Sequence, residues 1–96
     1  MLNDTSPLNV FLTVVNEKSF TRAAEKLLRT QPAVSLAVQR LEGELGETLI
    51  DRSGRDLALT DAGKVVFEAA RRQENLHQEL LSRLAELRNT AVGRLV

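Results

Sequence analysis

Residues 19–46 read SFTRAAEKLLRTQPAVSLAVQRLEGELG, and this stretch predicts two helices joined by a tight turn. Ser19 and Thr30 are suited to begin the two helices, because a short side-chain oxygen can accept a hydrogen bond from a free N–H group of the first turn. Gly46 is suited to end the second helix, since glycine adopts the left-handed conformation that often follows a last helical turn. The turn itself falls at residues 28–30. The order of these signals predicts a helix-turn-helix.

The second helix of this pair has two different faces. Its apolar arc, at 100° per residue, consists of Val34, Val38, Leu41 and Leu45. Its opposite arc carries Pro32, Leu36, Gln39 and Gly43, with Ser35 and Arg40 on its flanks. The small residues Ala23 and Ala24 permit a close crossing with this helix, and Val34 can fill the space beneath them. We therefore expect Ala24 to be a packing residue.

The flanking sequence predicts a helix before this pair, and a hairpin and a long helix after it. Ser6-Pro7 is a helix start, and a helix over about residues 7–17 would share the apolar stripe Leu8, Phe11, Leu12 and Val15. Two β-capable runs, residues 48–52 and 56–59, surround the turn residues 53–55 and predict a two-stranded hairpin. Phe20 and Leu27 are expected to point inward with the two alanines.

A long helix is predicted from the cap at Thr60 to about Asn89, with a linker extending to residue 91. Its apolar stripe comprises Val66, Ala70, Gln73, Leu76, Leu80, Leu84, Leu87 and Ala91. Roughly 30 helical residues span about 45 Å, which the preceding residues 1–59 are too few to cover. The leucines Leu76, Leu80, Leu84 and Leu87 are therefore expected to pair with a second copy of the chain. Residues 93–96 look like the first residues of a strand, and residues 92–96 are expected to begin a further domain, so we expect either a fragment or a short natural protein.

Composition excludes several classes of protein. The chain has 96 residues, no cysteine and one histidine, so we expect one small domain without disulfides, metal ions or cofactors. No nucleophile–base pair or phosphate loop is visible, which makes an enzyme the least favoured reading, with no catalytic residues. No apolar run reaches the roughly 20 residues that cross a bilayer, and the N-terminus lacks the basic start of a signal peptide. We therefore expect a cytoplasmic protein that does not bind membranes.

Charge is distributed unevenly along the chain although the formal net charge is zero. Residues 18–40 carry five basic side chains and one acidic one, whereas residues 41–51 carry four acidic side chains and no basic one. The positive segment coincides with the helix-turn-helix. An α-helix with short polar and amide side chains fits the major groove of DNA, where glutamine can bond adenine edges and arginine can bond guanine edges. The alternative is an amphipathic helix with a solvated outer face.

The hairpin after the helix-turn-helix favours DNA binding over that alternative. A hairpin in this position is a wing, and Arg52 and Arg55 within it would reach phosphates or a minor groove. Recognition helices usually enter the groove by their N-terminal end. Gln31 and Ser35 are thus expected nearest the bases and Gln39 and Arg40 nearest the backbone. Solvated turn charges remain the other interpretation of the two wing arginines.

Four motifs follow one another along the chain, namely SFTxAAxxL at 19–27, TQPAVS at 30–35, LExxLGxxLIxRxxR at 41–55 and LTxAG at 59–63. In the order and spacing of these motifs, the chain resembles the N-terminal domain of LysR-type transcriptional regulators over residues 8 to about 90. The resemblance implies a mainly α fold, a winged helix-turn-helix of three helices and a two-stranded wing, followed by a long dimerisation and linker helix. It also implies a homodimer on double-stranded DNA, with tetramers in the full-length protein. A small-molecule effector would bind only a further domain that follows near Gly93.

Position by position, the resemblance places several residues on DNA. These are Thr30, Gln31, Pro32, Ser35, Gln39 and Arg40, with Arg52 and Arg55 on the backbone or minor groove. Leu36 is either a contact with a thymine methyl group or an indifferent exposed leucine. The sequence departs from the family pattern at Thr30, where serine is usual, and at Ile50, where phenylalanine is usual.

Two other functions remain open at this stage. A different winged-helix regulator, MarR-like or molybdate-responsive, would bind DNA by the same physical principles, but its wing and linker would have different spacing in the sequence. A winged helix used only for protein–protein contact is disfavoured by the basic segment and by the two wing arginines.

Overall fold

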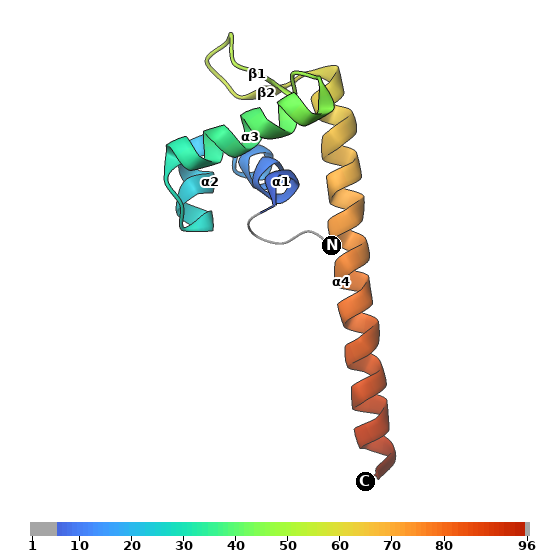
Figure 1. The fold of residues 1–96 in the computed structure, drawn as a ribbon. Coiled ribbons are helices and arrows are strands. Elements are labelled where there is room, and N and C mark those ends of the chain that lie inside the picture. The colour runs from blue at the N-terminus through green and yellow to red at the C-terminus, as the bar shows by residue number, and fades with distance from the viewer. Residues whose placement is uncertain (1–5, 96) are drawn as a thin grey trace.

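Three short helices and a hairpin precede one long helix in the computed structural model, which describes residues 6–95 (Figure 1). The elements are α1 (Pro7–Glu17), α2 (Phe20–Leu27), α3 (Gln31–Leu45), β1 (Ile50–Asp51), β2 (Ala58–Leu59) and α4 (Asp61–Leu95). α1, α2 and α3 pack together beside the start of α4, whose remaining length projects away from them. The molecule measures 60 × 26 × 22 Å. This is the mainly α, winged helix-turn-helix architecture that the sequence predicts.

Side-chain caps begin the helices where the sequence predicts them. The Ser19 hydroxyl accepts a hydrogen bond from the Arg22 N–H at 3.1 Å, and the Thr30 hydroxyl accepts one from the Ala33 N–H at 3.2 Å. Each bond satisfies one of the N–H groups that a first helical turn leaves without a partner. Gly46 follows α3 in the left-handed conformation, with φ 69°. The predicted turn between α2 and α3 is therefore confirmed.

The core lies between the three short helices and the base of the wing. Its fully or almost fully buried side chains are Val10, Phe11, Val14, Ala23, Ala24, Val34, Val38, Leu41, Leu49 and Ile50. The burial of Ala24 and Val34 confirms the predicted close crossing of α2 and α3. In α1 the buried face is wider than the predicted stripe, because Val10 and Val14 are buried more completely than Leu8 and Val15.

Leu45 is an exception to the predicted apolar face of α3. Its side chain is 47% exposed, whereas Leu41, one turn earlier, is 6% exposed. Leu45 is the last residue of α3, and the chain turns away from the helix at Gly46. The helical period placed it correctly on the face, but the core ends one turn before it.

The wing is a short antiparallel hairpin, with strands shorter than the predicted β-capable runs. Ile50 pairs with Leu59 and Asp51 pairs with Ala58. At its base Leu49 and Ile50 are buried in the core, and the Leu49 carbonyl accepts a hydrogen bond from the Thr60 N–H at 3.0 Å. The wing is thereby attached to both the core and the start of α4.

The first turns of α4 pack on the domain, and the rest of the helix leaves it. The Thr60 hydroxyl caps the helix by accepting a hydrogen bond from the Gly63 N–H at 2.9 Å. Ala70 is fully buried and Val66 is partly buried against the core, so these two residues of the predicted apolar stripe are covered within the chain itself. Gln73 is exposed, and the side chain of Ala91 lies outside the described residues.

The C-terminal boundary of α4 was also predicted wrongly. The helix continues to Leu95, so the expected end near Asn89 and the expected strand at residues 93–96 are corrected, with Val96 outside the described residues. A single glycine inside a helix is disfavoured by only about 1 kcal/mol relative to alanine, which does not stop a long helix at Gly93. Among the helices of residues 6–95, none combines the length and hydropathy needed to cross a bilayer.

Candidate nucleic-acid interface

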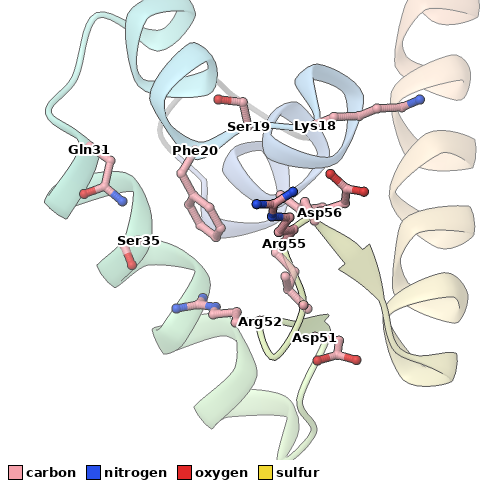
Figure 2. Close-up of a pocket in the computed structure, with 12 residues that line it drawn as sticks. Lys18, Ser19, Phe20, Gln31, Ser35, Asp51, Arg52, Arg55 and Asp56 are labelled. Atoms are coloured by element: carbon pink, nitrogen blue, oxygen red, sulfur yellow. The ribbon is translucent and has the colours of Figure 1, made fainter.

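A groove of about 400 Å³ separates the N-terminal half of α3 from the wing (Figure 2). α3 contributes Gln31 and Ser35, and the wing contributes Arg52 and Arg55. Lys18, at the end of α1, completes the set of basic side chains around the groove. The fold therefore gathers two uncharged polar side chains and three basic side chains around one concave surface.

Not all of the predicted site residues line this groove. Thr30, Pro32, Leu36, Gln39 and Arg40 are exposed along α3 without lining it. Leu36 is 46% exposed, which leaves both of its predicted roles open. Gln39 borders a second depression, of about 380 Å³, together with Glu42 and Arg52. The Thr30 hydroxyl serves the cap of α3, so this residue has a structural task in addition to any contact with DNA.

Arg52 is held in place by two other parts of the fold. Its guanidinium carbon lies 5.0 Å from the centroid of the Phe20 ring at the start of α2. Its Nη2 atom lies 3.9 Å from Oε1 of Glu42 on α3. The side chain extends from the wing toward α3, and Phe20 points toward it (Figure 2). The Arg52 side chain is still 40% exposed, so it remains accessible from the groove.

Arg55 is more loosely held than Arg52. It is exposed at the far side of the wing turn, and within residues 6–95 it forms no ion pair. Lys18 and Asp56 lie near it around the groove (Figure 2). An exposed guanidinium without an internal partner is available to an incoming phosphate.

The turn of the wing is ordered by Asp51. Its Oδ1 atom accepts hydrogen bonds from the Ser53 hydroxyl at 2.6 Å and from the Ser53 N–H at 2.9 Å. These two hydrogen bonds lower the pKa of the Asp51 carboxyl below its ordinary value of 3.8. The carboxylate is thus occupied in shaping the turn that precedes Arg55.

Three side chains of the site were not singled out by the sequence. Phe20 was expected only as an inward-pointing residue, Lys18 was counted only as a charge, and Glu42 was counted as a charge and as a position of the family motif without a role. For Glu42 a signal was available, since an acidic residue in the last turn of a helix faces the negative end of the helix dipole and needs compensating partners. The contact between Phe20 and Arg52 joins residues 32 positions apart, which no local pattern reveals.

Residues 6–64 match the family of bacterial regulatory helix-turn-helix proteins designated the lysR family. The chain belongs to this family. It is 43% identical over 89 residues to a probable RuBisCO transcriptional regulator of Cyanidioschyzon merolae, a match that covers 93% of this chain and 29% of the relative. It is 41% identical over 88 residues to the RuBisCO operon transcriptional regulator of Allochromatium vinosum, covering 92% of this chain and 29% of that protein. The chain thus spans less than a third of these two LysR-family relatives.

Solved structures of LysR-family proteins share the fold. A complex of BenM_DBD with catB site 1 DNA superposes with a TM-score of 0.78 at 33% identity, covering 88% of this chain and 93% of that chain. Vibrio fischeri DarR in complex with DNA superposes with a TM-score of 0.74 at 33% identity, covering 91% of this chain and 30% of that chain. The LysR architecture therefore extends beyond residues 6–64 and into the long helix.

Proposed function

We propose that this chain is the DNA-binding module of a transcription regulator and acts as a homodimer on double-stranded DNA. The observation that carries the proposal is the groove between α3 and the wing, where Gln31 and Ser35 face three basic side chains. Amide and hydroxyl groups read base edges, and cations bind the phosphates that flank them. The family relatives named as transcriptional regulators and the two neighbours solved with DNA support the same assignment.

In this proposal α3 enters the major groove by its N-terminal end. Gln31 and Ser35 contact bases, and Pro32 packs against the sugar–phosphate wall or a thymine methyl group. Thr30, Leu36, Gln39 and Arg40 continue along the exposed face of α3, with the last two near the backbone. Arg52 and Arg55 contact the backbone or the minor groove from the wing.

The second copy of the chain is proposed to bind along α4. Leu76, Leu80, Leu84 and Leu87 are 42–67% exposed and recur at helical spacing on the part of α4 that projects beyond the domain. Burying one leucine side chain contributes about 1.5–3 kcal/mol, so this stripe favours association. In a longer protein, the chain after residue 95 would lead to an effector-binding domain, tetramers would form, and the protein would act in the cytoplasm.

The test compares binding to selected and scrambled DNA. Duplexes are selected from a randomised pool with the unmodified chain, and the dissociation constants for selected and scrambled duplexes are then measured at one salt concentration. We expect a preference for the selected duplex, and Gln31→Ala is expected to weaken that complex by about 1–3 kcal/mol while leaving the scrambled one almost unchanged.

Two outcomes contradict parts of the proposal. Absence of any duplex binding at low salt would remove the assignment to DNA. Equal losses on both duplexes for Gln31→Ala would make Gln31 a backbone contact, and no loss on either would leave it a solvated residue.

A further inference from the structure

We infer that Glu42 is a positioning residue that holds Arg52 in the orientation in which the wing meets DNA. The inference rests on the proposed DNA binding and adds a component to it near the C-terminal end of α3, on the face that also carries Gln31 and Ser35. Glu42 does not line the main groove, and its side chain is only 17% exposed. It therefore acts through the residues that it contacts.

The two carboxylate oxygens of Glu42 have different partners. Oε2 accepts hydrogen bonds from the backbone N–H groups of Leu49 and Ile50, at 2.8 and 3.3 Å. Oε1 faces the guanidinium of Arg52 at 3.9 Å. One carboxylate on α3 therefore fixes the start of β1, and it also orients the side chain of Arg52, which directly follows β1.

The position of Glu42 at the end of α3 is unfavourable for an acidic side chain unless its contacts with the wing compensate the charge. It lies in the last turn of α3, where the helix dipole disfavours an acidic side chain. The N–H groups that it satisfies belong to Leu49 and Ile50, which are 0% and 2% exposed and would otherwise leave buried donors without a partner. The carboxylate is thus compensated from the wing, and the wing is fixed relative to α3.

Phe20 supplies the second restraint on Arg52. The guanidinium lies over the ring at 5.0 Å from its centroid, so the arginine is held between an aromatic face on α2 and a carboxylate on α3. Neither contact uses all five N–H donors of a guanidinium, and the exposed remainder is free for a phosphate or a base edge. Because a free arginine side chain loses conformational entropy when it binds, holding it beforehand strengthens binding.

The experiment separates the charge of Glu42 from its position. Glu42→Gln keeps an acceptor for the Leu49 and Ile50 N–H groups but removes the attraction for Arg52. Glu44→Gln is the matched control, since Glu44 is exposed on the same helix and forms no hydrogen bond or ion pair within residues 6–95. Both variants change the net charge equally, so long-range attraction to DNA changes equally. Binding of a mixed-sequence duplex is measured by fluorescence anisotropy.

We expect Glu42→Gln to bind the duplex about two- to tenfold more weakly per engaged subunit than Glu44→Gln. In an Arg52→Gln background, the two glutamine variants are expected to bind equally. A purely structural role for Glu42 would give the same loss with and without Arg52. Phe20→Leu provides a second measurement, because it keeps an apolar side chain but removes the aromatic face. The loss of duplex affinity that it causes is also expected to disappear in the Arg52→Gln background.

The outcomes distinguish this inference from the proposed function. Equal affinities of Glu42→Gln and Glu44→Gln in the otherwise unmodified chain would overturn the positioning role and leave DNA binding intact. A loss that persists undiminished in the Arg52→Gln background would overturn it as well. If the unmodified chain does not bind any duplex at low salt, the proposed function is wrong and the inference is wrong with it.

Discussion

Gly63 lies so close to the base of the wing that a Cβ atom at this position would overlap the backbone oxygen of Leu49. Gly63→Ala must therefore displace backbone, because a carbonyl oxygen cannot rotate away as a flexible side chain can. We expect this substitution to lower the free energy of unfolding by about 2–3 kcal/mol, which is measured by thermal or urea denaturation.

Gly43→Ala is the matched control for this prediction. A Cβ atom at Gly43 meets nothing within 4 Å, and the residue lies inside α3. Alanine there is expected to raise the free energy of unfolding by about 0.5–1 kcal/mol, since glycine disfavours a helix interior. Similar effects of the two substitutions would show that α4 does not approach the wing as closely as the structure has it.

Leu28 combines a left-handed backbone with an almost fully exposed side chain. Its φ is 57° and its side chain is 93% exposed, at the turn between α2 and α3. Leu28→Gly removes the steric strain between Cβ and the backbone without removing a packing contact. We expect an increase of about 0.5–1 kcal/mol in the free energy of unfolding. Leu27→Gly, one residue earlier and packed against the core, is expected to decrease it.

Leu80 and Leu81 offer a matched pair for the proposed dimer. Each is 46% exposed, but they point about 100° apart around α4, and only Leu80 shares a face with Leu76, Leu84 and Leu87. Leu80→Asp is expected to shift the chain toward monomer in analytical ultracentrifugation and to weaken DNA binding through lost bivalency. Leu81→Asp is expected to leave the dimer unchanged. Dimers of equal strength in both variants would place the interface elsewhere.

Arg55 is predicted to act as a phosphate contact. Arg55→Ala should weaken binding to all duplex sequences and reduce the slope of log affinity against log salt by about one unit per subunit. Arg88→Ala removes the same charge from an exposed position on α4 that does not line the groove, and it is expected to leave the slope unchanged. An unaltered slope for Arg55→Ala would exclude a direct phosphate contact.

Local signals predicted most of the fold because the helices begin and end at residues that cap them, either by a side-chain hydrogen bond or by a left-handed backbone conformation. Ser19, Thr30 and Gly46 each act through groups within four positions, so their effects are visible in sequence order. The helical period also placed Val34 correctly in the core, and the small size of Ala24 correctly indicated a close helix crossing. Where the core stops is a property of the whole domain, which explains the error at Leu45.

The candidate site was predicted less completely than the fold. Gln31, Ser35, Arg52 and Arg55 were expected at the interface, and the structure brings them together around one groove. The partners that orient Arg52 come from α2 and α3, and only the folded arrangement places Phe20 and Glu42 on either side of it. The end of α4 was predicted too early, since the single glycine at position 93 does not stop a long helix.

The helical structure of the outer half of α4 is expected to depend on the concentration of the protein. Thirty-five residues extend over about 52 Å, and an isolated helix without a packed face is only marginally stable in water. In the proposed homodimer, the partner supplies that packing, so dilution below the dissociation constant would unwind the helix from its far end while the globular domain stays folded. Exchange of backbone amides beyond Leu76 would then quicken with dilution, and the unwound segment would become the first site of proteolytic cleavage.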